Sequence, residues 1–157
     1  MLIVVFSNSD GEQFKKNIPD HMNSCVIGPI GDYIDIKSAS EEIMKSDVVS
    51  FVHESMVVDF DVLINGMNTL SGNNKYGIVY FDYLRNINRA TIPRLRRSYK
   101  KKKNNCVPVF GSVISGDLVP VVLSELVGSD KLEIDSFLSS ELDGFTPYHA
   151  PRFAFKI

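Results

Sequence analysis

Three hydrophobic runs stand out along the chain. They lie at 2–6 (Leu-Ile-Val-Val-Phe), 47–52 (Asp-Val-Val-Ser-Phe-Val) and 76–81 (Tyr-Gly-Ile-Val-Tyr-Phe), and polar or turn-forming residues follow each of them. Runs of this length without polar alternation are typical of strands that are buried on both faces, as in a parallel sheet. We therefore predict that the three runs form the central strands of one sheet.

The segments between these runs have features of helices and of shorter strands. Residues 38–46 begin with the spacing of a capping box, and residues 133–142 place apolar side chains at helical intervals. Helices are predicted at 12–22, 38–46, 59–70, 118–126 and 133–142. Shorter strands are predicted at 25–27, 33–36, 107–114 (bent, or divided in two) and 152–157. This alternation predicts an α/β fold, a three-layer sandwich with a mostly parallel, Rossmann-like central sheet, in which ligands gather beyond the carboxyl ends of the strands.

Composition narrows the class of protein. The chain has 157 residues, 44% of them hydrophobic, which is enough for a single domain spanning 1–157 with one core. No apolar run approaches the roughly 18 residues of a membrane helix, and no basic segment precedes the first run, so we expect no membrane partner. Cys25 and Cys106 are far apart. That spacing favours a reducing compartment, and we expect a cytoplasmic protein in which both are core thiols.

Charge is unevenly distributed along the chain. Nine of the seventeen basic residues lie within a basic segment at 85–103, and no acidic residue occurs between Asp82 and Asp117. The rest of the chain carries eight basic against nineteen acidic residues. Such a block is either a solvated loop or a contact surface for a polyanion, with Tyr83 or Tyr99 available to stack on a base. The candidate nucleic-acid-binding residues are Arg94, Arg96, Arg97, Lys100, Lys101, Lys102 and Lys103, and we predict a helix from about residue 94 to 102.

Two sets of polar residues are candidates for chemistry. His53-Glu54-Ser55 follows the second run directly, at the mouth of the predicted sheet, where His53 and Glu54 could bind a divalent metal or a metal-bound phosphate; the alternative is a solvent-facing loop. Glu133 and Asp135 open a predicted helix, where capping explains them about as well as a general base does. The chain has no GxGxxG, Walker, GxSxG or HExxH motif.

The order of these segments resembles the nucleotide-sugar glycosyltransferases of the A-type fold, in the large family-2-like group. In that family a helix leads into a hydrophobic strand that ends in Asp-x-Asp or a His-x-Asp variant, as 38–55 does here with His53-Glu54-Ser55. A Gly-rich strand, an acidic pair that opens a helix, and a Gly-aromatic segment follow in the family. The counterparts in this chain are 111–117, Glu133-Ile-Asp135 and 143–151.

The resemblance implies a set of site residues. Asn8, Ser9, Asp10 and Asp35 would hold the nucleoside, while His53 and Glu54 would manage the diphosphate, with Mn²⁺ or Mg²⁺ as the expected divalent cation. Ser55 occupies the position of the family's metal-binding Asp, so metal dependence is open unless Glu54 or Asp59 substitutes for it. Asp135, with Glu133 as its substitute, would be the general base that deprotonates the acceptor hydroxyl. The basic segment implies an anionic acceptor, best a hydroxymethylated base as in phage DNA, with a saccharide as the alternative.

Two other functions fit parts of the sequence. Residues 45–52 (Lys-Ser-Asp-Val-Val-Ser-Phe-Val) also resemble the nucleoside deoxyribosyltransferases, but the helix at 59–70 lacks the nucleophilic Glu of that family. A non-catalytic module that binds nucleic acid through the basic segment is the third hypothesis. Binding of a nucleotide sugar would separate the first function from the third.

Overall fold

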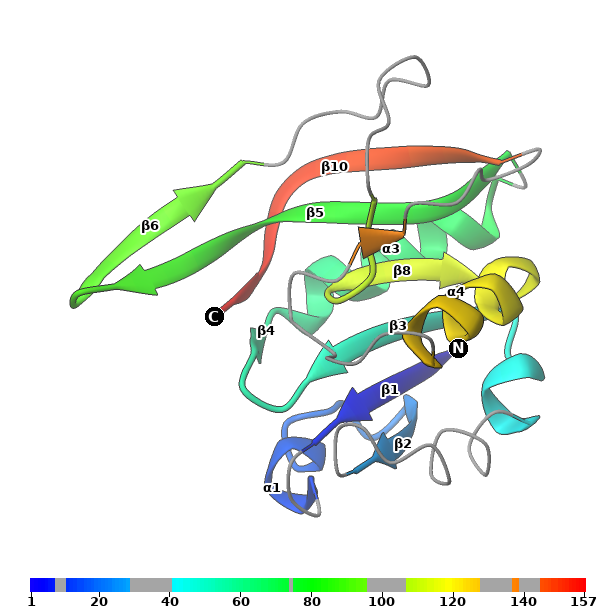
Figure 1. The fold of residues 1–157 in the computed structure, drawn as a ribbon, viewed down its shortest axis with the longest axis horizontal. Coiled ribbons are helices and arrows are strands. Elements are labelled where there is room, and N and C mark those ends of the chain that lie inside the picture. The colour runs from blue at the N-terminus through cyan, green and yellow to red at the C-terminus, as the bar shows by residue number, and fades with distance from the viewer. Residues whose placement is uncertain (8–10, 29–40, 74, 96–106, 128–136, 139–144) are drawn as a thin grey trace.

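One mixed sheet of eight strands organises the computed structural model (Figure 1), which describes the chain except for residues 8–10, 29–40, 74, 96–106, 128–136 and 139–144. Seven strands follow the order β2-β1-β3-β8-β5-β10-β4, and β6 pairs with β5 outside this path. The strands are β1 (Leu2–Phe6), β2 (Asn23–Ile27), β3 (Val48–His53), β4 (Val57–Val58), β5 (Tyr76–Ile87), β6 (Ala90–Arg94), β8 (Ser112–Ser115) and β10 (Thr146–Lys156).

The amino-terminal half is parallel. β1 pairs in parallel with β2 on one side and with β3 on the other, so that Phe6 lies opposite both Ile27 and His53. All five residues of β1 and all six of β3 are buried. The uninterrupted hydrophobic runs therefore predict these two strands correctly, because central strands are covered on both faces.

The rest of the sheet is not parallel. β8 lies between β3 and β5 and is antiparallel to both. β6 is antiparallel to β5, and β4 is antiparallel to β10. The α/β class is confirmed, but among the described strands only the β1–β2, β1–β3 and β5–β10 pairs are parallel, so the expectation of a mostly parallel sheet is wrong. Segment 107–114 divides into β7 (Val107–Pro108) and β8, since Gly111, at φ 71°, turns the chain between them.

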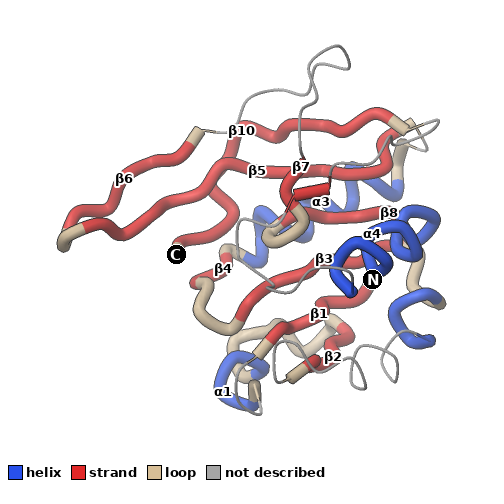
Figure 2. Tube along the Cα trace, in the orientation of Figure 1, coloured by secondary structure: helices blue, strands red, loops and turns tan. Residues whose placement is uncertain are grey.

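Helices cover both faces of the sheet. α3 (Phe60–Ser71) lies behind the sheet in Figure 2, and α4 (Val119–Val127), preceded by the 3-10 turn η1 (Gly116–Leu118), lies in front. The Asp59 side chain caps α3 by accepting the Val62 N–H at 3.2 Å. Both helices agree with the sequence prediction, and Leu63, Met67 and Leu70 turn the buried side of α3 toward the sheet.

Two predicted helices are corrected. Within 12–22 only α1 (Glu12–Lys15) is α-helical, and Pro19 follows shortly after it. In 133–142 the described residues form a strand, β9 (Phe137–Leu138), antiparallel to β7 in a separate two-stranded sheet. Pairing with a segment about thirty residues earlier overrides the local helical spacing there.

A long hairpin extends from the sheet where the sequence suggested a loop and a helix. β5 continues six residues past Phe81 and turns back into β6 at Asn88 and Arg89, whose φ angles of 48° and 68° form a two-residue turn. We call residues 84–94 the hairpin arm. The predicted helix from residue 94 is therefore wrong at its start, because Arg94 lies on a strand, opposite Tyr83.

β10 closes the far side of the sheet and curls it. It runs parallel to β5 with three register shifts, and its end turns to pair with β4, directly after β3 in the chain. Such irregularities bend a strand and increase its twist. The sheet consequently curls round toward the end of β3.

Candidate functional site

The best candidate site lies where β1 and β3 end. Because these neighbouring strands are parallel, their carboxyl ends meet at one edge of the sheet, with Ser7 after β1 and Glu54 after β3. From β1 the chain passes to β2 on one side and later to β3 on the other. The boundary between β1 and β3 is thus a topological switch point, the place where open α/β sheets bind ligands.

Hydrogen bonds lock the two strand ends together. The Ser7 hydroxyl, fully buried, donates to the Glu54 carboxylate. The backbone N–H of Glu54 donates to the Phe6 carbonyl at 2.9 Å, and that of Ser7 donates to the Ile27 carbonyl at 2.9 Å. The Glu54 carboxylate therefore has a fixed position at the edge.

The His53 imidazole is hydrogen-bonded to Ser55, two residues further along the chain. Its Nδ1 accepts the backbone N–H of Ser55 at 3.1 Å and lies 2.8 Å from the Ser55 hydroxyl. Burial lowers the pKa of His53, and the negative charge of Glu54 opposes this only in part. The imidazole is therefore neutral at pH 7, with its proton on Nε2, because Nδ1 serves as an acceptor.

A cavity of about 410 Å³ opens beside this edge. That volume is within the range of small-molecule sites, roughly 300–1,000 Å³. Its polar groups come from Asn17, Glu54 and Ser55, and its apolar wall includes Phe14 and Phe60, whose ring centroids are 6.4 Å apart. The remaining lining residues are Met56, Val57 and Val58.

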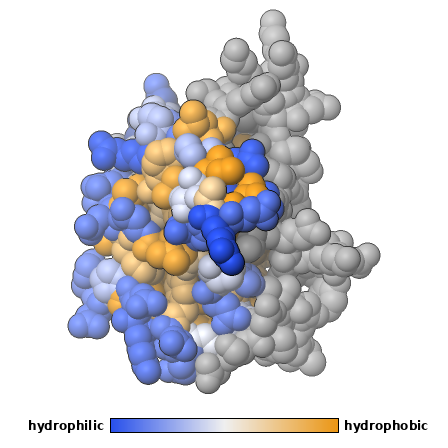
Figure 3. All heavy atoms as spheres, turned by 90° about the vertical axis from the view of Figure 1, so that its left-hand side faces the viewer, coloured by the Kyte–Doolittle hydropathy of each residue, from blue (hydrophilic) through white to orange (hydrophobic). Residues whose placement is uncertain are grey.

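Figure 3 views the molecule from the side on which β1 and β3 end. In the coloured part of this face, hydrophobic side chains form patches near the middle, among hydrophilic side chains that also line the left and lower borders. The cavity at this edge likewise combines a few polar groups with apolar side chains, as small-molecule sites do.

The described residues fit a metal ion poorly. Among them no group of three or more His, Cys, Asp or Glu side chains lies close enough to hold one. Nδ1 of His53 is already engaged by Ser55, and Asp59 caps α3, so neither assists Glu54 in the arrangement seen here. We therefore assign no chemical step to a metal.

The structure places some of the predicted site residues and not others. It brings His53 and Glu54 to one edge, as the sequence predicts, and it adds Ser7. Arg94 lies on β6. The other predicted residues lie outside the described part of the chain: Asn8, Ser9, Asp10, Asp35, Glu133, Asp135, Arg96, Arg97, Lys100, Lys101, Lys102 and Lys103.

One polar pair was missed by the sequence analysis. His149 Nε2 lies 2.9 Å from Asp82 Oδ1, and the imidazole stacks on Tyr80 with centroids 5.0 Å apart. The only signal in the sequence is a carboxylate directly after the hydrophobic run at 76–81. No spacing rule connects it to a histidine 67 residues later.

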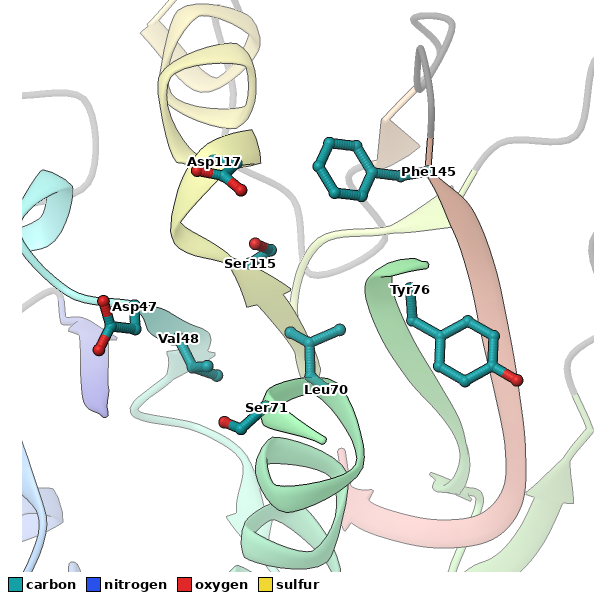
Figure 4. Close-up of a pocket in the computed structure, with 8 residues that line it drawn as sticks. All are labelled: Asp47, Val48, Leu70, Ser71, Tyr76, Ser115, Asp117 and Phe145. Atoms are coloured by element: carbon teal, nitrogen blue, oxygen red, sulfur yellow. The ribbon is translucent and has the colours of Figure 1, made fainter. Parts of the chain in front are cut away.

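A second cavity, of about 370 Å³, lies at the opposite edge of the parallel strands (Figure 4). The carboxylates of Asp47 and Asp117 line it on either side of Ser115, with Tyr76 and Phe145 across from them. Since ligands of open α/β sheets bind at the carboxyl ends of the strands, we prefer the β1–β3 edge as the candidate site.

Comparisons with known proteins give no relative from which to transfer a function. No protein-family model matches the chain, and no curated protein matches it significantly. Within the described residues, no helix is long and apolar enough to cross a bilayer.

Proposed function

We propose that the chain is a glycosyltransferase that binds a nucleotide-sugar donor at the β1–β3 edge. The observation that carries the proposal is the Ser7–Glu54 hydrogen bond across the switch point, next to the 410 Å³ cavity. An A-type, Rossmann-like nucleotide-binding half agrees with the parallel order β2-β1-β3. The finer assignment to that fold is part of the proposal.

The cavity offers the contacts that a nucleoside needs. Glu54 and Asn17 provide oxygens for ribose or base hydrogen bonds, and Phe14 and Phe60 provide an apolar wall. The segment Asn8-Ser9-Asp10 joins β1 to α1 and belongs to the proposed nucleoside site, together with Asp35. A divalent cation stays a proposal that rests on the family resemblance alone.

Transfer follows from this assignment. An acceptor hydroxyl attacks the anomeric carbon of the donor sugar, the bond from that carbon to the diphosphate oxygen breaks, and the nucleoside diphosphate leaves. Asp135, or Glu133 in its place, takes the hydroxyl proton. We propose a hydroxymethylated base in DNA as the acceptor, with a saccharide as the alternative; the excess of basic residues in 85–103 supports an anionic acceptor.

Donor binding is the first test. Wild-type protein should gain thermal stability with one of the UDP, GDP, CMP or ADP sugars, by about 2.7 kcal/mol at a hundredfold excess over the dissociation constant. Glu54→Gln should weaken that binding about tenfold or more, since hydrogen bonds to charged groups contribute about 1.5–3 kcal/mol. Glu41→Gln, at a side chain that is 82% exposed, is the matched control. A protein that binds none of the donors, or a Glu54→Gln variant that binds like wild type, would contradict the proposal.

The base is tested separately. Asp135→Asn should abolish transfer and leave donor affinity nearly unchanged, because a general base acts on the acceptor's proton in the transition state. Full activity in this variant would exclude Asp135, and Glu133→Gln would then be expected to show the loss.

A non-catalytic nucleic-acid-binding module is the second candidate. The exposed, basic hairpin arm is the observation that favours it. Absence of donor binding together with retained DNA binding would make it the better description.

A further inference from the structure

The hairpin arm is an exposed two-stranded ribbon. All five residues of β6 are exposed, and Arg85 and Asn86 on β5 are exposed as well. In Figure 1 the arm extends away from the body of the sheet. Because the arm is exposed, it adds little to the core. The stability of the fold therefore does not explain why the hairpin is this long.

The pairing of β5 with β6 puts the basic side chains of the arm on one face. Arg85 lies opposite Ile92, and Arg94 lies opposite Tyr83. Because side chains alternate along a strand, the odd-numbered residues of β5 and the even-numbered residues of β6 share this face. Arg89 adds a third cation at the turn.

Within the described residues no ion pair involves Arg85, Arg89 or Arg94, whereas the exposed lysines Lys15 and Lys45 each pair with a glutamate. The chain also contains no Asp or Glu between 82 and 117. An exposed ribbon with two arginines on one face and a third at its turn, none of them in an ion pair with another described residue, is complementary to a row of phosphates.

Strand direction brings the arm to the edge that carries the candidate site. β8 is antiparallel to both β3 and β5, so β5 runs in the same direction as β1 and β3. The arm is the carboxyl-terminal extension of β5, and it leaves the sheet on the side where Ser7 and Glu54 lie. A polymer held by the arm would therefore lie at the same edge of the sheet as the donor cavity.

The residue types of the arm favour a duplex over a single strand. Single-strand binders stack bases on aromatic side chains, but residues 84–95 contain none. One face of the Tyr83 ring is covered by Phe155, with centroids 5.3 Å apart and an interplanar angle of 5°, which weakens the expectation that Tyr83 stacks on a base. A two-stranded ribbon fits the major groove of B-form DNA, about 12 Å wide, but not the deep, narrow groove of A-form RNA.

We propose that the hairpin arm enters the major groove of a DNA duplex and holds it through Arg85, Arg89 and Arg94, with the target base next to the cavity at the β1–β3 edge. The binding step stands on the arm alone. The use of the bound duplex as acceptor rests on the proposed function.

The test is binding of a fluorescent 20-base-pair DNA duplex, measured by anisotropy between about 50 and 300 mM salt. The double variant Arg85→Gln/Arg94→Gln should lower the slope of log affinity against log salt by about 2, using roughly 0.9 per phosphate contact, and weaken binding on the order of tenfold to a hundredfold at 100 mM salt. The control Lys45→Gln/Lys75→Gln removes the same charge from exposed residues that precede β3 and β5, at the opposite edge of the sheet. In this control, the slope of log affinity against log salt should fall by no more than half as much as it falls in the arm variant.

Further measurements separate the possible outcomes. A single strand and an RNA duplex of the same sequence should bind more weakly than the DNA duplex; equal or tighter binding of either would overturn the groove assignment. An arm variant that binds like the control would overturn the role of the arm. DNA binding that depends on the arm in a protein that binds no nucleotide sugar would leave the arm inference standing and remove the proposed function. Donor binding without DNA binding would do the reverse.

Discussion

His149 on β10 and Asp82 on β5 form a hydrogen-bonded pair, 2.9 Å between Nε2 and Oδ1, with side chains that are 12% and 5% exposed. The pair joins two strands that are parallel neighbours at a point where their register shifts between Ala150 and Phe153. A buried polar group that loses its partner costs about 1–3 kcal/mol. The two side chains therefore help to fix the alignment of β10 against β5.

Removal of either partner should destabilise the fold. We expect Asp82→Ala to lower the free energy of unfolding by about 1–3 kcal/mol. In a double-mutant cycle with His149→Ala, the coupling energy should be at least about 0.5 kcal/mol. Urea denaturation measures both quantities, with Asp20→Ala, at an exposed carboxylate, as the control. Additive effects of the two substitutions would show that the pair does not act as a unit.

Acid should weaken the fold through His53. Burial lowers the pKa of His53 in the folded protein relative to the unfolded chain, where histidine titrates near pH 6.5. As the pH falls below about 6.5, the unfolded state therefore binds more protons than the folded state, and the free energy of unfolding falls. Above about pH 6.5 the neutral His53 imidazole makes its full contribution to the free energy of unfolding.

An NMR titration of the His53 imidazole checks this directly. Its midpoint should lie below 6.5, and His53→Gln should reduce the loss of stability between pH 7 and 5. A midpoint at or above 6.5 would contradict the neutral, Ser55-bonded imidazole.

Cys25 should be slow to alkylate. Burial, followed by the negative charge of Glu42, raises the pKa of its thiol to about 12. The smaller thiolate fraction at pH 8, offset in part by higher intrinsic nucleophilicity, gives a reaction about fifty- to a hundredfold slower than for a free cysteine. Iodoacetamide labelling of a Cys106→Ser variant, with N-acetylcysteine amide as reference, measures the ratio. A rate like that of the reference would contradict the raised pKa of the half-buried Cys25 thiol.

Gly111 should not tolerate a side chain. Its φ is +71°, and an added Cβ would lie 2.1 Å from Cε1 of Phe155. Left-handed backbone strain and overpacking together predict a loss of about 2–4 kcal/mol for Gly111→Ala. At Gly72, whose φ is −84° and whose nearest neighbour would be 3.3 Å away, Ala should cost little. Thermal unfolding of the two variants compares them, and similar stabilities would contradict the close packing between β10 and the turn before β8.

The sequence predicted the elements that local pattern determines. β1, β3 and α3 follow from hydrophobic runs and from a helical stripe of apolar residues. Strand direction was not predictable, because the short apolar segment that forms β8 has the same composition whether it runs parallel or antiparallel. β6 was missed for a different reason: proline is depleted in strands, and pairing with β5 overrides that preference at Pro93.

The site was partly predictable on the same grounds. Polar residues after a buried strand indicate a sheet mouth, and His53 and Glu54 lie there. That the Nδ1 of His53 would be used by Ser55, instead of by a ligand, depends on a tight turn that spacing does not reveal. The pairing of Asp82 with His149 depends on β10 lying beside β5, a contact between distant parts of the chain.

Within the described residues the outer edge of β6 pairs with no other strand, and an unpaired strand edge can add strands from other chains and aggregate. The two-residue turn makes Ile87 and Ala90 the pair that exchanges hydrogen bonds, so Pro93 falls at a position whose missing N–H faces outward. Arg94 and Arg89 surround that gap with like charge. Pro93 offers a neighbouring chain no N–H donor, and the arginines repel a second copy of the same edge. Residues of the arm should therefore also keep concentrated protein from forming fibrils.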